Sequence, residues 1–172
     1  MTDSIPTSVD GLSLRFATED DVPLILAFIR GLAEYEKLAH EVVATEDKLR
    51  RWLFGERREA EVVLAEHAGD PAGFALFFHK FSTFLGEPGI YLEDLFVLPE
   101  KRGLGIGEVL LTFLGHLALE RDCQRIEWVV LDWNEPALKF YRRLGAQALD
   151  DWTGHRVDGD ALTALAAKFP SS

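Results

Sequence analysis

The sequence predicts a mixed α/β fold, and three observations support this prediction. Leu12, Leu14 and Phe16 alternate with polar residues, which is the period-two pattern of a strand. Apolar residues recur at helical spacing over 22–33 and 109–118. The intervening segments hold short apolar runs bounded by Gly- and Pro-containing turns, which are typical of further strands. We expect antiparallel strands first, followed by a strand–helix–strand unit that is parallel and right-handed.

Length and composition narrow the class of protein. The 172 residues are enough for one packed domain and short for two. The net charge of -11 argues against a general nucleic-acid or anionic-membrane binder and is compatible with a cationic substrate. Cys123 is the single cysteine, so an internal disulfide and a Cys-based zinc site are excluded, and the histidines have no metal-ligand spacing. No targeting segment and no run of ~20 apolar residues is found, so we expect a cytoplasmic protein.

The first elements follow from local signals. Residues 1–11 are expected to be a loose leader before a single domain over 12–169, which starts with a strand at 12–16. Thr18 and Asp21 form a variant of the capping box and predict a helix that reaches about residue 37. A second, short helix is expected to start after Thr45, to stop at Gly55 and to bury Leu49, Trp52 and Leu53.

The remaining elements follow from apolar runs, turn residues and helix stop signals. They are expected in this order: strands 60–67 and 72–80 joined by a hairpin connection at 68–71, a strand over 90–97, a helix after Gly107, a buried strand over 126–131, a helix over 136–144 closed by Gly145, short strands at 147–149 and 154–157, and a helix over 160–168.

The segment 95–108 carries the clearest chemical signal. A buried strand leads into a basic turn with glycines at 103, 105 and 107, and the turn opens a helix. Glycines allow positive φ and bring backbone N–H groups close to a ligand. The helix start adds further donors and the positive end of the helix dipole, which suits a phosphate or pyrophosphate. Lys101 and Arg102 add positive charge, while a purely structural glycine turn remains the alternative.

Two other phosphate-binding loops fit poorly. A Walker loop ends in Gly-Lys-Ser/Thr, whereas Gly107 is followed by Glu108 and Val109. A dinucleotide fingerprint has the spacing Gly-x-Gly-x-x-Gly near the first strand, whereas this Gly-x-Gly-x-Gly spacing comes late in the chain.

The Arg-x-x-Gly-x-Gly pattern of 102–107 resembles the GNAT N-acetyltransferase superfamily, together with Glu93-Asp94 before it and the run 133–145 after it. The strings 91–97 (Tyr-Leu-Glu-Asp-Leu-Phe-Val) and 133–136 (Trp-Asn-Glu-Pro) are similar to the diamine (spermidine/spermine) and thialysine acetyltransferase subfamily. The resemblance covers about residues 12–145.

This resemblance implies a mixed, mostly antiparallel sheet of about six to seven strands flanked by helices, with a parallel splayed pair at the cofactor site. It implies acetyl-CoA as co-substrate and no metal. The implied cofactor-binding residues are Leu95, Phe96, Val97, Arg102, Gly103, Leu104, Gly105, Ile106, Gly107, Glu108, Asn134, Glu135, Pro136, Ala137 and Tyr141. The Val97 amide is the implied donor to the thioester carbonyl, where a pre-aimed N–H is worth ~3 kcal/mol to the oxyanion formed by amine attack.

The resemblance also implies catalytic roles. Tyr141 matches the family's general acid, and proton donation to the leaving thiolate is feasible because a thiol has pKa ~8.5 and a phenol ~10. The alternative is that Tyr141 is only a core residue. Glu93 is implied to hold the cationic amine and to accept its proton. Asp94 is not expected to share this role, because adjacent strand residues face opposite ways. Asp94 is therefore assigned to structure. Tyr35 and Glu36 match substrate-contacting residues, with a solvated helix end as the alternative.

The implied function is transfer of an acetyl group from acetyl-CoA to a primary amine by direct attack in a ternary complex. Thr153 stands where diamine acetyltransferases usually carry an acidic residue, so the acceptor can be smaller, such as thialysine. The competing functions are a non-catalytic acyl-CoA sensor and an acetyltransferase for protein lysines or N-termini. The resemblance also implies a homodimer that shares its active site.

Overall fold

The computed structural model describes residues 4–170, so part of the expected leader, residues 1–3, lies outside the described residues. The chain forms two compact units, Met1–Leu131 and Asp132–Ser172. The first unit holds a β-sheet with the helices that cover it, and the second holds the two remaining helices.

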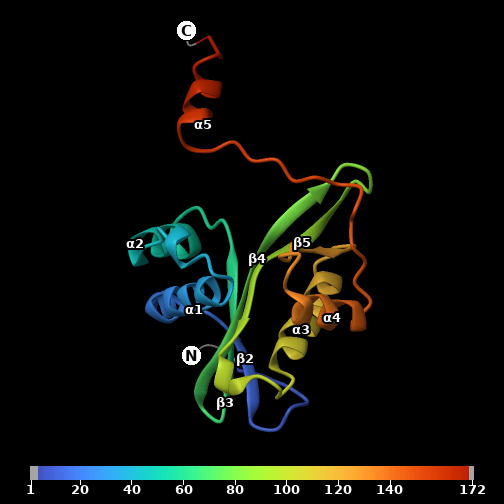
Figure 1. Cartoon of the computed structure of the whole chain (residues 1–172). Coiled ribbons are helices and arrows are strands. Elements are labelled where there is room, and N and C mark those ends of the chain that lie inside the picture. The colour runs from blue at the N-terminus through green and yellow to red at the C-terminus, as the bar shows by residue number, and fades with distance from the viewer. Residues whose placement is uncertain (1–3, 171–172) are drawn as a thin grey trace. The chain divides into compact units, whose positions relative to one another are not determined.

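The first unit is built on a six-stranded sheet with the spatial order β1-β2-β3-β4-β5-β6 (Figure 1). Strands β1 to β5 pair antiparallel, and β5 and β6 pair parallel. The predicted mixed, mostly antiparallel sheet with one parallel pair is therefore confirmed. The strands are β1 Ile5–Pro6, β2 Leu12–Phe16, β3 Glu61–His67, β4 Asp70–Ser82, β5 Glu87–Val97 and β6 Ile126–Glu127.

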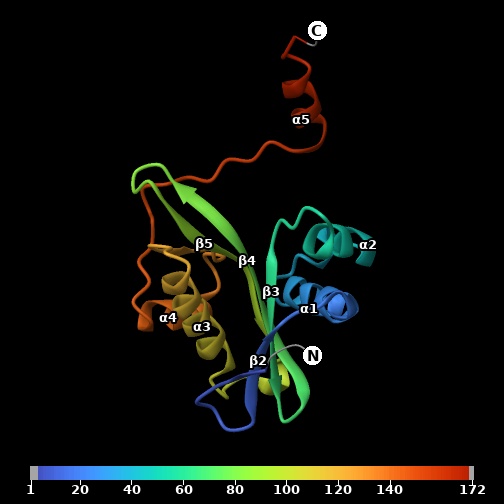
Figure 2. The same cartoon turned by 180° about the vertical axis from the view of Figure 1, so that it is seen from behind.

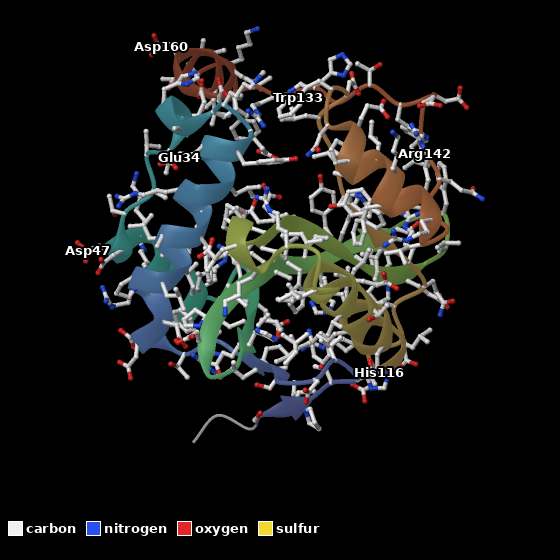
Figure 3. The ribbon with its side chains drawn as sticks, turned by 60° about the horizontal axis from the view of Figure 1, so that its bottom comes forward. Glu34, Asp47, His116, Trp133, Arg142 and Asp160 are labelled. Atoms are coloured by element: carbon white, nitrogen blue, oxygen red, sulfur yellow. The ribbon has the colours of Figure 1, made fainter. Side chains whose placement is uncertain are left out.

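The helices of this unit cover both faces of the sheet. They are α1 Val22–Tyr35, α2 Glu46–Leu49 and α3 Ile106–Glu120, with short turns η1 Glu19–Asp21, η2 Ala39–Glu41, η3 Arg50–Phe54 and η4 Pro99–Lys101. Helices α1 and α2 lie on one face and α3 on the other (Figures 1 and 2). In Figure 3, Glu34 marks the end of α1 and His116 marks α3 on the opposite side of the sheet.

Alternation along the strands divides the core between these two faces. On the α1 face, Ile25 and Phe28 pack against Phe74, Leu76 and Phe96. The Phe28 and Phe74 rings are stacked with their centroids 5.4 Å apart. The facing residue pairs Phe74–Phe96 and Leu76–Asp94 place Asp94 on this same face. One side of β5 therefore carries both a core aromatic ring and a carboxyl group.

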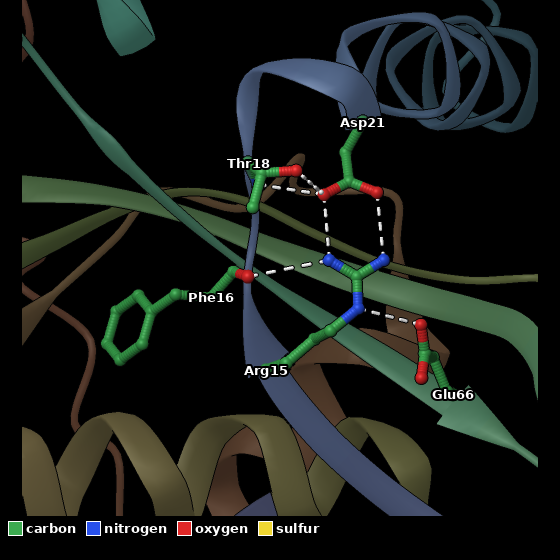
Figure 4. Close-up of polar contacts among 5 residues, drawn as sticks. All are labelled: Arg15, Phe16, Thr18, Asp21 and Glu66. Atoms are coloured by element: carbon green, nitrogen blue, oxygen red, sulfur yellow. Dashed lines mark hydrogen bonds and ion pairs between the residues drawn. The ribbon is translucent and has the colours of Figure 1, made fainter. Parts of the chain in front are cut away.

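A partly buried ion-pair cluster fixes the start of α1 to the sheet (Figure 4). The Arg15 guanidinium donates to both carboxylate oxygens of Asp21, at 2.7 and 2.8 Å, and its Nε donates to Glu66 at 2.8 Å. The Asp21 carboxylate also accepts from the backbone N–H and the hydroxyl of Thr18, which confirms the predicted capping box. The hydrogen bonds from Arg15 lower the pKa of Asp21 from 3.8 to about 2, and burial opposes this shift.

Two predictions for the N-terminal strands and their connections differ from the structure. Ile5 and Pro6, within the expected loose leader, pair with Leu14 and Ser13 as a short edge strand. The hairpin connection is only Ala68 and Gly69, with φ of 57° and 85°, so residues 70 and 71 already belong to β4. Positive φ at both central residues is typical of a type I′ turn, whose twist matches that of the flanking strands.

Two further predictions assigned too many residues, one to the buried side of a helix and one to a strand. Leu53 is buried as predicted, whereas Trp52 is 40% exposed and the Arg51 guanidinium lies 4.6 Å from its ring centroid. Both residues lie in η3, which continues α2 as a π-helical turn. Strand β6 contains only Ile126 and Glu127 of the predicted 126–131 strand. Val129, which lies within the predicted buried strand, is 79% exposed. The apolar run is therefore longer than the part of it that pairs with β5.

The second unit contains α4 Glu135–Arg143 and α5 Gly159–Ala166, whose labelled residues in Figure 3 are Arg142 and Asp160. Both helices were predicted to within one or two residues. The predicted strands at 147–149 and 154–157 do not form in the described residues, and every residue of 147–170 is exposed. So short a strand requires a pairing partner to be stable, and the second unit supplies none.

Candidate active site

The candidate donor site begins at the open edge of β5. Strand β6 pairs only with Ile90 and Tyr91, so residues 92–97 have β4 on one side and no described strand on the other. The Leu98 N–H donates to Ala72 of the β4 side at 2.9 Å. Because successive amides of a strand point to opposite edges, the Val97 N–H points to the open edge. The end of β5 can therefore accept an additional extended chain.

The glycine-rich turn follows directly after this edge. Gly103 and Gly105 have φ of 80° and 79°, so both occupy the left-handed region that favours glycine. Gly105 is the residue that precedes the first turn of α3, and Gly107 lies inside the helix. Two of the three glycines, rather than all three, thus shape the turn. A helix start with 15 residues behind it provides N–H donors and the positive end of a dipole, as an anionic group requires.

Arg102 lies between the open edge and the end of α1. Its Nε donates to the Val97 carbonyl at 3.1 Å, and its guanidinium carbon lies 4.7 Å from the Tyr35 ring centroid and 5.8 Å from that of Phe96. This arrangement was not foreseen, since the sequence pattern assigned Arg102 to the cofactor alone.

Tyr35 and Glu36 are held by a Schellman motif at the end of α1. The Leu38 N–H donates to the Ala33 carbonyl at 2.8 Å, and the Lys37 N–H donates to the Glu34 carbonyl at 3.1 Å. Lys37 has φ of 62°, a position that usually holds glycine. The motif fixes where α1 stops, and so fixes the backbone of the two residues predicted to contact substrate.

A β-bulge changes the orientation expected for the two acidic residues of β5. Phe77 faces Leu92 and the preceding residue Leu76 faces Asp94, so Glu93 is the extra residue of the bulge. A bulge interrupts the alternation of side chains and bends the strand. The prediction that Glu93 and Asp94 must face opposite ways rested on unbroken alternation, so it does not apply at this point of β5. Glu93 is exposed and Asp94 is partly buried.

Asp94 is the most perturbed carboxyl group of this region. Burial raises its pKa from 3.8 to about 7, and the negative charges of Glu93 and Glu36 raise it further. Burial also raises the pKa of Glu36. Three carboxyl groups, one at the end of α1 and two on β5, thus lie close enough for the charges of two of them to act on the third. Such a group favours a cation, whose binding would relieve the mutual repulsion.

The sequence-predicted residues of the second unit lie on and before α4. The Asn134 side chain accepts a hydrogen bond from the Ala137 N–H at 3.3 Å and so caps the helix, with Pro136 in its first turn. Tyr141 is half-buried, and its ring centroid lies 5.1 Å from that of Phe140. Gly145 has φ of 89° and closes α4 as predicted.

The first unit brings together most of the predicted residues: Tyr35, Glu36, Glu93, Leu95, Phe96, Val97 and Arg102, with 103–108 following. A cavity of about 270 Å³ between Phe54, Val62 and Arg121 contains none of them. Among residues 4–170, no three His, Cys, Asp or Glu side chains are arranged to hold a metal ion. No helix within those residues combines the length and the apolar character needed to cross a bilayer.

This geometry combines a strand edge with an aimed N–H, an anion-binding turn and a group of carboxyls. A family model described as "Acetyltransferase (GNAT) family" matches residues 26–146, which is more than half of the chain. The chain belongs to the GNAT acetyltransferase family. It is an acyltransferase, since curated proteins with similar sequences are named N-acetyltransferases.

The relatives indicate which branch of the GNAT family this chain resembles. The thialysine N-epsilon-acetyltransferase of Bos taurus is 39% identical over 166 residues, covering 90% of this chain and 97% of that protein. The L-ornithine N5-acetyltransferase of Arabidopsis thaliana is 32% identical over 197 residues, covering 88% of this chain and 86% of that protein. The predicted thialysine and polyamine subfamily is thus confirmed.

Solved structures share the GNAT fold. An integron cassette protein from the mobile metagenome of V. cholerae superposes with a TM-score of 0.76 at 26% identity, covering 91% of this chain and 98% of that one. An aminoglycoside acetyltransferase from an uncultured soil sample gives a TM-score of 0.72 at 19% identity, which shows the common fold.

Proposed function

We propose that this enzyme transfers the acetyl group of acetyl-CoA to a primary amine of a small cationic acceptor. The observation that carries the proposal is the group of three interacting carboxyls: Glu93 and Asp94 on the strand that ends at Val97, and Glu36 at the end of α1. A protonated diamine, polyamine or thialysine-like amino acid supplies the positive charge that such a group favours. Two relatives are named for acetylation of thialysine and of L-ornithine, and both compounds belong to this class of acceptor.

On the donor side, the glycine turn holds the pyrophosphate of acetyl-CoA through the backbone of 103–108. The pantetheine arm lies along the open edge of β5. The Val97 N–H then donates to the thioester carbonyl oxygen, which becomes an oxyanion when the amine adds. A single pre-aimed donor of this kind is worth ~3 kcal/mol.

On the acceptor side, a carboxylate must remove a proton from the ammonium before the nitrogen can attack. Glu93, exposed at the bulge, attracts the cation, and Asp94 has a pKa of about 7 that suits proton transfer near neutral pH. We therefore extend the role assigned to Glu93 to both residues. The nitrogen lone pair attacks the thioester carbon, and the nitrogen then loses its second proton to water. Collapse of the intermediate breaks the carbon–sulfur bond and expels the coenzyme A thiolate. Tyr141 is the proposed acid that protonates this thiolate.

Direct transfer is favoured over an acyl-cysteine intermediate. Cys123 is 1% exposed, and burial raises the pKa of its thiol, so little thiolate is present. Cys123→Ala is expected to retain turnover, as measured by steady-state kinetics. Loss of most activity in a folded variant would refute direct attack.

The acceptor is tested by a screen for thiol release from acetyl-CoA. The panel holds diamines, polyamines, thialysine, ornithine, lysine and aminoglycosides, and an unstructured lysine peptide tests protein acetylation. We expect release with a small diamine or amino acid. Binding of acetyl-CoA without release for any acceptor would instead identify a sensor, and release only with the peptide would identify a protein acetyltransferase.

A homodimer is part of the proposal. The C-terminal residues leave many large apolar side chains exposed: Leu149, Trp152, Val157, Leu162, Leu165 and Phe169. Exposed apolar surface of this extent favours a protein partner, and a second copy is the partner that the family resemblance implies. Light scattering coupled to size exclusion tests this, with a monomer as the contradicting result.

A further inference from the structure

Arg102 connects the donor and acceptor halves of the site in the first unit. Its Nε donates to the carbonyl of Val97, the last residue of β5, at 3.1 Å. Its guanidinium lies 4.7 Å from the ring centroid of Tyr35, the last residue of α1. The arginine itself is the first residue of the glycine turn. One residue of the turn thus contacts both other elements, β5 and α1, that the reaction must align with it.

The peptide group between Val97 and Leu98 is hydrogen-bonded on both sides. Its carbonyl accepts from Arg102, while the amide of the same peptide, the Leu98 N–H, donates to Ala72 at 2.9 Å. Because N–H and C=O of one strand residue point to the same edge, the Val97 carbonyl lies on the open edge of β5. Arg102 therefore occupies the Val97 carbonyl on this edge, and the Val97 N–H is left to hydrogen-bond a bound acetyl-CoA.

The contact with Tyr35 depends on the shape of the guanidinium. A planar, delocalised guanidinium stacks on an aromatic ring and at the same time donates from Nε, whereas a lysine ammonium is a compact point charge. Phe96 extends the aromatic surface, with its ring centroid 5.8 Å from the same guanidinium. Tyr35 directly precedes Glu36, whose negative charge raises the pKa of Asp94, so the end of α1 that carries Tyr35 also carries part of the acidic group.

We propose that Arg102 is a positioning residue that orients Tyr35 for the amine and Val97 for the thioester, beyond any charge it offers to phosphate. The inference rests on the proposed amine acetylation. The inference concerns the shape of the arginine side chain rather than its charge. The two can be told apart because Lys101 also carries positive charge at the turn.

The test compares Arg102→Lys, Arg102→Gln, Tyr35→Leu and the double variant Arg102→Lys/Tyr35→Leu, with Lys101→Gln as the charge control. Arg102→Lys keeps the charge and is expected to raise the amine KM several-fold while the acetyl-CoA KM stays near that of the parent. The double variant is expected to resemble Tyr35→Leu, so that the two effects fall short of additivity by roughly two- to fivefold. Lys101→Gln is expected to raise the acetyl-CoA KM and leave the amine KM unchanged.

Two results would overturn the proposal. One is an Arg102→Lys enzyme with the parent amine KM, which would reduce Arg102 to a positive charge for the pyrophosphate. The other is full additivity of the Arg102 and Tyr35 effects. The same double-mutant cycle, measured by urea unfolding, needs no substrate: additivity there refutes the Arg102–Tyr35 contact itself. Absence of turnover with every amine, with a non-additive unfolding cycle, would count against the proposed function and support the contact.

Discussion

The buried carboxyl of Asp94 gives a prediction with a definite size. Folding raises its pKa from 3.8 to about 7, so the folded state binds this proton more tightly than the unfolded chain. The contribution of Asp94 to stability is therefore complete below about pH 4 and is lost as the pH rises through about 7. An asparagine at this position stays neutral at every pH, so Asp94→Asn removes the dependence.

The magnitude follows from the shift. A difference of about three pKa units corresponds to ~4 kcal/mol at about 1.4 kcal/mol per unit, which is an upper value because a flexible site relaxes. Relative to Asp94→Asn, the parent is expected to lose roughly 2–4 kcal/mol of unfolding free energy between about pH 4 and pH 8. The variant should consequently be the more stable protein at about pH 8, although it lacks the proposed base.

The assay is urea unfolding followed by circular dichroism across this pH range. Glu93→Gln is the matched control, because Glu93 is the adjacent carboxylate and is exposed. Its stability should still fall with pH as in the parent, with the midpoint moved to lower pH because one of the charges that raise the pKa of Asp94 is gone. In parallel, kcat/KM of the parent should rise through about pH 7, and Asp94→Asn should lose ~100-fold. Parallel stability profiles for the parent and Asp94→Asn would refute the claim that this carboxyl is forced toward its neutral form.

Further predictions concern the packing, the ion-pair cluster and the acid. Gly31→Ala in α1 would place a methyl 2.9 Å from the ring of Phe96, whereas Gly115→Ala in α3 meets nothing within 4 Å. Thermal unfolding should therefore show a loss of ~1–3 kcal/mol for the first and a gain of up to ~1 kcal/mol for the second, and equal effects would contradict the packing. Asp21→Asn should lower the free energy of unfolding by ~2 kcal/mol at neutral pH, because the lowered pKa of Asp21 stabilises the folded state. This stabilisation is complete above about pH 4 and is lost as the pH falls through about 2. A variant with the acid transition of the parent would contradict this prediction. Tyr141→Phe should lower kcat strongly with the acetyl-CoA affinity retained, and normal turnover would assign the proton to another group or to water.

Much of the fold could be predicted because its signals are local. The alternation of 12–16 and the pairing of Thr18 with Asp21 depend on neighbours in sequence, and both were predicted correctly. Residues 147–157 show why local signals are insufficient, since their pattern predicts strands and no strand forms there in the described residues. Strand formation depends on a partner, which a single segment does not reveal. Trp52 was misplaced because a π-helical turn rotates its side chain out of the expected stripe.

The site was predicted in its parts and not in its details. The glycine turn could be found because Gly103 and Gly105 are needed for a positive φ, a requirement that sequence expresses directly. The bulge at Glu93 has no such signature, since it arises from the register between β4 and β5. The raised pKa of Asp94 follows from burial and from charges that are distant in sequence, and so does the contact of Arg102 with Tyr35.

The central claim is that the turn at 103–108 and the open edge of β5 bind an acyl-CoA. Calorimetric titration of the folded chain with coenzyme A and with acetyl-CoA tests it directly. The account predicts saturable heat for both compounds and a clearly weaker signal for Gly105→Ala, whose methyl-bearing residue is strained at a φ of 79°. Absence of heat from the folded parent protein with both compounds would contradict the claim.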